Sequence, residues 1–183
     1  SVWDANTSGS SHKKHIDYIT IASAGNSADF GELTVARPEA GGFGSSTRGI
    51  CAGGYDALSP NNPQDTIDYV TIATTGNATD FGNLTVARQA PGSASSSTRG
   101  VIAGGYASPA WQNTIDYVTI ATTGNATDFG DLVTALFGQF VGNCSDKIRG
   151  VFAGGKVSNP TYTNSIDYVT IATTGNAQDF GDL

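Results

Sequence analysis

An internal repeat of about fifty residues constrains this sequence more than any other feature. A sixteen-residue segment at 67–82 recurs unchanged at 115–130 and with one substitution at 166–181, and a more divergent copy lies at 16–31. A second marker, Arg-Gly-x-x-Ala-Gly-Gly, alternates with the first and lies at 48–54, 99–105 and 149–155. The chain is therefore expected to fold as a series of similar units, each of which buries apolar surface against its neighbours.

Composition and charge argue against two kinds of partner. No segment approaches the roughly eighteen consecutive apolar residues of a membrane-spanning helix. The net charge is −7 and the pI is near 4.5, whereas binding to nucleic-acid phosphates needs a footprint of Lys and Arg. We therefore expect neither a membrane nor a nucleic acid as a partner.

Each unit is predicted to contain four short strands. In the third unit, segment 115–123 alternates β-branched residues with Tyr, which is typical of a strand. Gly124 and Asn125 tolerate positive φ and predict a turn. Gly130, inside the next strand, indicates a bulge or a close approach of another backbone. The four strands expected in this unit are 93–98, 99–106, 115–123 and 126–135.

The expected fold class is all-β, because four short strands recur in every unit and no helical period is present. Segment 67–73 carries no charge except Asp68, as a sheet covered on both faces requires. These features favour a β-propeller of about four units with an incomplete ring; a parallel β-helix is the alternative, but its coils are usually shorter. We expect one repeat domain over 1–183, with units at approximately 1–44, 45–92, 93–143 and 144–183.

Marker residues follow one another in a fixed order within each unit. A Gly-Gly pair, a variable loop, an Asp-Tyr pair and an aromatic residue are followed in the first two units by Arg37 and Arg88. This order resembles the kelch motif of the galactose-oxidase-like propellers, and the resemblance covers nearly the whole chain. The sequence departs from that motif at Leu136, which replaces the Arg, and at four Phe residues that replace the usual Trp, Phe30, Phe81, Phe129 and Phe180.

The amino-acid sequence of the repeat shows a second resemblance. The string Ile-Asp-Tyr-Val-Thr-Ile-Ala-Thr-Thr-Gly-Asn-Ala-x-Asp-Phe-Gly resembles repeats in virion and tail-fibre proteins of tailed phages, especially marine cyanophages. That resemblance implies a structural or receptor-binding component of a phage particle, located in the virion or outside the cell. The alternative is a secreted or cell-surface glycan-binding module of a marine microorganism.

The phase of the repeat predicts unpaired strand edges. Naming the strands of a unit a to d, the sequence opens with a c–d pair, continues with two complete units and finishes with a third. Exposed strand edges promote association. We therefore expect either neighbouring repeats in a longer polypeptide or self-association that closes a ring.

Variation among the units predicts where a ligand would bind. The d–a and b–c loops vary, and both emerge on the same face of a propeller, whereas the turns on the opposite face are constant. Aromatic side chains on loops over a rigid scaffold suit the recognition of a host-surface glycan or protein. The alternative is that these aromatic residues only plug the bases of the loops. The candidate ligand-binding residues are Trp3, Trp111, Phe137, Phe140 and Tyr162.

No catalytic residue is predicted, because the sequence shows no nucleophile–base set and no cluster of metal ligands. His12 and His15 stand three residues apart in one unit only, which favours a solvated loop over a metal site. Acidic residues recur in every unit, and a structural role in turns is favoured for them. The minority interpretation is a repeated Ca²⁺ site at Asp80, Asp128, Asp131 and Asp179. We otherwise expect no cofactor and no enzymatic activity.

Overall fold

The computed structural model describes residues 14–56, 58–59, 62–137 and 142–183, which contain strands and no helix. Two of the candidate ligand-binding residues, Trp3 and Phe140, lie outside these ranges. The expected all-β class is confirmed.

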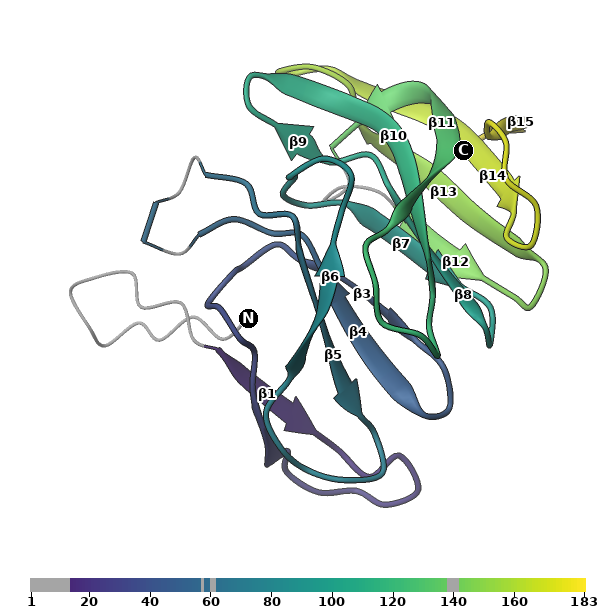
Figure 1. Cartoon of the computed structure of the whole chain (residues 1–183). Helices are drawn as coiled ribbons and strands as arrows, with labels where there is room; N and C mark the ends of the chain where they lie inside the picture. The colour runs from purple at the N-terminus through teal and green to yellow at the C-terminus, as the bar shows by residue number, and fades with distance from the viewer. Residues whose placement is uncertain (1–13, 57, 60–61, 138–141) are drawn as a thin grey trace.

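Within the described residues, fifteen strands form four antiparallel sheets that follow one another along the chain (Figure 1). The first sheet contains β1 (His15–Tyr18) and β2 (Ala28–Glu32). The second contains β3 (Gly41–Gly44), β4 (Arg48–Ala52), β5 (Thr66–Thr71) and β6 (Thr79–Asn83). The third contains β7 (Gly92–Ser95), β8 (Arg99–Ala103), β10 (Ala110–Thr119) and β11 (Thr127–Leu136), with the short β9 (Tyr106–Ala107) paired to β10. The fourth contains β12 (Gly142–Ser145), β13 (Arg149–Lys156), β14 (Tyr162–Thr170) and β15 (Gln178–Asp182).

Each of the three larger sheets contains the four predicted strands, but β3, which lies within the expected unit 1–44, pairs with β4 in the second sheet. The order within the second, third and fourth sheets is a–b–c–d, and the first sheet contains only a c–d pair among the described residues. The turn at Gly124 and Asn125 joins β10 to β11, and the register of these two strands shifts between Ile115 and Asp116, opposite Gly130. The predicted bulge is therefore present, because the extra residue in the pairing lies beside this glycine.

Two hydrophobic cores lie between consecutive sheets rather than within any one of them. One core joins the second and third sheets and contains Ile67, Phe81, Ile102 and Ile120. The other joins the third and fourth sheets and contains Phe129, Phe152 and Ile171. The second, third and fourth sheets therefore bury apolar side chains against one another, as expected for a repeat protein.

The constant Gly-Asn-Ala turn of each sheet is hydrogen-bonded to strand d, here called the outer strand, of the preceding sheet. At the contact between the second and third sheets, Gly124 N–H donates to Phe81 O (2.8 Å), and Ala126 N–H donates to Asn83 O (2.8 Å). Asn83 N–H in turn donates to Asn125 Oδ1 (3.1 Å). We call each contact between consecutive sheets a joint, and the same three bonds recur at the first and third joints.

A glycine in each outer strand makes this close approach possible. A Cβ on Gly82 would lie 2.5 Å from Gly124 O, and one on Gly31 would lie 2.3 Å from Gly76 O. Both glycines have φ near +150°, a conformation that other residues rarely adopt. The constant parts of the repeat, strands and turns alike, thus serve the contact between units.

A buried ion pair crosses the first two joints. Arg37 and Arg88 follow the outer strands β2 and β6, and each pairs with the Asp in the c strand of the next sheet, Asp68 or Asp116, at 2.8 and 2.9 Å. All four side chains are fully buried. Thr34 and Thr85 complete the two arrangements, because each donates its backbone N–H and its hydroxyl to the same carboxylate.

Candidate functional site

Three aromatic rings form a cluster at one end of the third sheet. The ring centroids of Trp111 and Phe137 are 5.0 Å apart, and those of Tyr106 and Trp111 are 5.5 Å apart. Tyr106 also contacts Phe137 edge-on at 6.4 Å. All three side chains are half-buried, so the rings pack on one another and still present a surface to solvent.

Short backbone bridges hold the cluster in place. Tyr106 lies in β9 opposite Trp111 at the start of β10, and Tyr106 forms a bridge with Gln89 of the preceding connection. Phe137 N–H donates to Lys156 O (2.9 Å), which ties the end of β11 to β13 in the fourth sheet. The cluster is therefore anchored by residues of three consecutive units.

Lys156 adds a positive charge beside the rings. Its Nζ lies 5.9 Å from the centroid of the Trp111 ring, within the range of a cation–π contact. Tyr162 is the pairing partner of Lys156 between β13 and β14, and its side chain is exposed. The structure therefore brings Trp111, Phe137 and Tyr162 of the predicted set into one region.

Sequence reasoning missed Tyr106 and Lys156 in this group. Both follow a Gly-Gly pair directly, at the position that Tyr55 holds in the second unit. A comparison of that single position among the units would have identified them, because it is the first residue beyond the constant marker. The contact between Trp111 and Phe137 could not be found in this way, because it depends on how the b–c loop and the d–a loop of the unit meet.

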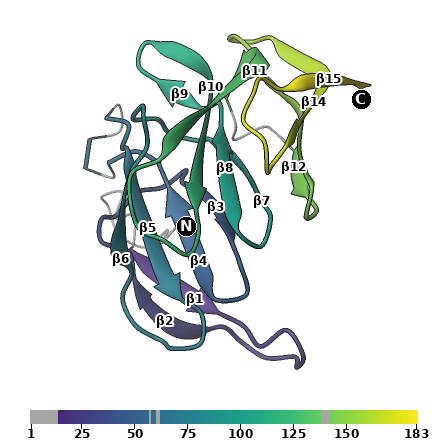
Figure 2. The same ribbon diagram turned by 45° about the vertical axis from the view of Figure 1, so that its right-hand side comes forward.

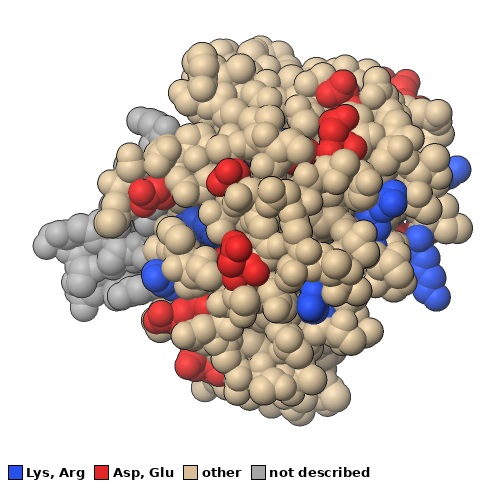
Figure 3. Space-filling view, viewed as in Figure 1, with Lys and Arg blue, Asp and Glu red and all other residues tan. Residues whose placement is uncertain are grey.

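The cluster and the constant turns lie at opposite ends of the third sheet. In Figures 1 and 2, β9 and the start of β10 project at one end, and the turn between β10 and β11 lies at the other. Figure 3 shows Lys, Arg, Asp and Glu scattered over the visible face, with broad uncharged surface between them. An aromatic cluster on such a surface offers stacking and hydrogen bonding rather than attraction by a strong charge.

The acidic residues considered for Ca²⁺ lie in strand d of each unit, along its pairing with strand c. Asp80, Asp128 and Asp179 face the buried Asp68, Asp116 and Asp167 across the pairs β5–β6, β10–β11 and β14–β15. Asp131 lies in the third joint, where its N–H donates to Asn176 Oδ1. Among residues 14–56, 58–59, 62–137 and 142–183, no three His, Cys, Asp or Glu side chains are grouped as metal ligands.

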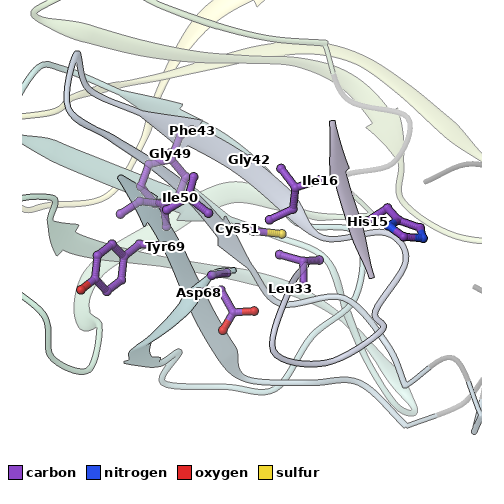
Figure 4. Close-up of a pocket in the computed structure, with 12 residues that line it drawn as sticks. His15, Ile16, Leu33, Gly42, Phe43, Gly49, Ile50, Cys51, Asp68 and Tyr69 are labelled. Carbon is purple, nitrogen blue, oxygen red and sulfur yellow. The ribbon is translucent and has the colours of Figure 1, made fainter. Parts of the chain in front are cut away.

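A hollow lies between the first and second sheets. It has a volume of about 410 Å³, and Phe43, Ile50, Cys51 and Tyr69 are among the residues that line it (Figure 4). Its walls are mostly apolar, and burial raises the pKa of the Cys51 thiol, which opposes the thiolate needed by a cysteine nucleophile. His15 and Asp68 also line this hollow, and Asp68 is held in the buried pair with Arg37.

The packing of the a and b strands, here called the inner strands, at the second and third joints explains this hollow. A Cβ on Gly100 of the third sheet would meet the ring of Phe43, and one on Gly150 of the fourth would meet Ala94 Cβ at 2.9 Å. The equivalent residue of the second sheet, Gly49, lines the hollow, and its nearest neighbour there is Val70 of its own sheet. The described part of the first sheet has no inner strands to fill this space.

Neither the scan of protein-family models nor the search of curated proteins finds a match to this chain. In the described residues, no helix is long and apolar enough to cross a membrane.

Proposed function

We propose that this chain is a non-enzymatic binding and structural module, in which stacked β-sheets present an aromatic loop cluster to a glycan or protein on a host surface. The observation that supports this proposal most directly is the cluster of Tyr106, Trp111 and Phe137 with Lys156 and Tyr162 beside it. Aromatic faces stack on sugar rings, and the Tyr hydroxyl and the Lys ammonium can hydrogen-bond to sugar hydroxyls.

The division between constant and variable parts supports a binding role. The constant residues form the joints between sheets, whereas the aromatic cluster arises from loops that differ among the units. Binding residues are commonly carried on loops that a rigid scaffold positions. Variation confined to loops therefore fits a module that keeps its scaffold and changes its ligand contacts.

We further propose that the four sheets are blades of a kelch-like β-propeller. The a–b–c–d order of the three larger sheets and the repeated joints support this arrangement. The amino-acid sequence of the repeat supports a location in a phage virion or tail fibre. A secreted glycan-binding module of a marine microorganism is the second candidate. Capsid or tail genes beside the coding gene would favour the first setting, and their absence would favour the second.

A glycan array tests the proposed binding role directly. The wild-type chain, Trp111→Ala, Tyr162→Ala and a control, Tyr18→Ala, would be compared; Tyr18 is an exposed aromatic residue of β1 in the first sheet. We expect binding by the wild type and the control, and a loss of at least tenfold in both cluster variants. Binding that Trp111→Ala and Tyr162→Ala leave unchanged would refute the proposed site.

A further inference from the structure

The first and fourth sheets carry the two complementary halves of a joint. The fourth sheet presents the outer strand β15, with Phe180 and Asp182 at the positions that Phe129 and Asp131 hold in the third joint. The first sheet presents the turn between β1 and β2, in which Gly25 and Asn26 correspond to Gly175 and Asn176. These two halves lie at opposite ends of the molecule (Figures 1 and 2), so a single chain in this arrangement cannot bring them together.

Side chains that are buried at internal joints are exposed on these two halves. Phe180 is 60% exposed, whereas the equivalent Phe81 and Phe129 are each 2% exposed. Ile21, in the first sheet, is 96% exposed, whereas the equivalent Ile120 and Ile171 at the second and third joints are at most 1% exposed. Ile72, at the first joint, is 48% exposed, and the described part of the first sheet lacks the a and b strands that would cover it. Exposed apolar surface of this kind marks a site of association.

The backbone of β15 retains the room that a joint needs. Gly181 has φ +137°, like the equivalent glycines in β2, β6 and β11, whose added Cβ atoms would strike the next sheet. No described atom outside its chain neighbours lies within 4 Å of a Cβ placed on Gly181. The β15 half of the joint is therefore shaped for contact and is unoccupied among the described residues.

Arg149 has the same stacked arrangement as the two Arg residues that donate across internal joints. Arg48 and Arg99 stack on Tyr69 and Tyr117 of their own sheets and donate across the joint to Ile120 O (2.9 Å) and Ile171 O (3.1 Å). Arg149 stacks on Tyr168 in the same way, at 4.9 Å. The corresponding acceptor in the unit that would follow is the carbonyl of Ile21.

We propose that two copies of this chain bind head to tail, with the 24–27 turn and Ile21 of one copy seated on β15 and Arg149 of the next. Gly25 N–H would donate to Phe180 O, Ser27 N–H to Asp182 O, and Asp182 N–H to Asn26 Oδ1, as in the three internal joints. Each copy keeps one half free after the first contact. Such a heterologous contact produces a closed ring or an open filament. This inference does not depend on the aromatic cluster.

Two variants that each destroy one half provide the test. Ile21→Asp disables the turn side and Phe180→Asp disables the β15 side, and both residues are exposed in the single chain. Leu58→Asp is the matched control, because Leu58 is an exposed apolar residue of the loop between β4 and β5. Molar mass would be measured by sedimentation over a range of concentrations, against the 18.7 kDa of one chain.

We expect the wild type and the Leu58→Asp variant to associate as concentration rises, and each of the other variants alone to remain a single chain. An equimolar mixture of Ile21→Asp and Phe180→Asp should give pairs and nothing larger, because only one intact joint can form in it. The proposal is overturned by a wild type that stays a single chain, by a loss of association in Leu58→Asp, or by a mixture that forms no pairs. Glycan binding by Ile21→Asp would report on the aromatic cluster separately.

Discussion

The second and third joints differ in the hydrogen-bond donors that they provide to an equivalent buried carboxylate. At the second joint, Asp116 receives the N–H and hydroxyl of Thr85 and pairs with Arg88. At the third joint, the equivalent Asp167 receives only the N–H of Val133, at 3.0 Å. Val133 and Leu136 occupy the positions of Thr85 and Arg88, so two of the three donor groups are missing.

The consequence is an unsatisfied carboxylate at the third joint. Asp167 is 1% exposed, and its Oδ1 has no hydrogen-bond partner. Burial raises the pKa of Asp167; the Val133 N–H opposes this shift and the nearby Asp179 adds to it. Backbone bonds and apolar packing therefore suffice to dock a sheet, whereas the ion pair and the Thr hydroxyl determine whether the retained Asp stabilises the joint.

The largest effect is expected from removing the Arg of the second joint. Arg88→Leu, which places at this joint the residue found at 136, should lower the free energy of unfolding by about 3 kcal/mol because it leaves a buried charge uncompensated. Urea denaturation would measure the change. Arg48→Leu is the comparison variant, since Arg48 is half-buried and donates across the same joint only to a backbone carbonyl, that of Ile120. A loss at Arg88 no greater than that at Arg48 would contradict the role given to the pair.

A smaller effect is expected from filling the space between inner strands. Gly100→Ala should cost about 2 kcal/mol, because its Cβ would overlap the Phe43 ring and overpack the second joint. Gly49→Ala should cost less, because its Cβ would meet only Val70 Cγ2, at 3.3 Å, beside the hollow. Thermal or urea unfolding of the two variants would show the difference, and equal costs would count against the packing described for these joints.

The third joint should lose stability as the pH rises and Asp167 gives up its proton. Because the folded-state pKa of Asp167 is raised above its unfolded value, its contribution to stability is fully present below the unfolded-state pKa and is lost as pH rises through the folded-state pKa. Asp167→Asn removes this dependence. The stability of Asp167→Asn relative to the wild type should therefore increase, by about 1 kcal/mol, from acidic to neutral pH in urea titrations. A constant difference across that range would show that Asp167 does not titrate as described.

Much of the fold could be predicted because the repeat is nearly perfect. Segments 67–82, 115–130 and 166–181 place their glycines identically and their β-branched residues with one exception, so one set of strands serves these units. The partners of the buried Asp could not be predicted, because Arg37 and Asp68 are 31 positions apart and belong to different sheets. The loss of Arg at Leu136 was visible in the sequence, but its effect on Asp167 depends on a contact across the joint.

The candidate site was predictable only in part. Trp111, Phe137 and Tyr162 stand in the variable loops, where binding residues were expected. The stacking of Trp111 on Phe137 and the approach of Lys156 depend on pairing between β9 and β10 and between Phe137 and Lys156. Such pairing among irregular segments has no periodic signal in the sequence.

The most direct test of the account exchanges Thr and Val, which have nearly the same shape, between the two joints. Thr85→Val removes a hydroxyl that donates to Asp116 Oδ1 (2.5 Å), and Val133→Thr offers one to the unpartnered Oδ1 of Asp167. Urea denaturation at neutral pH should show a loss of about 1 kcal/mol for Thr85→Val and a gain of similar size for Val133→Thr. Changes of the same sign in both variants, or no gain from Val133→Thr, would contradict the claim that the third joint differs from the second by missing donors.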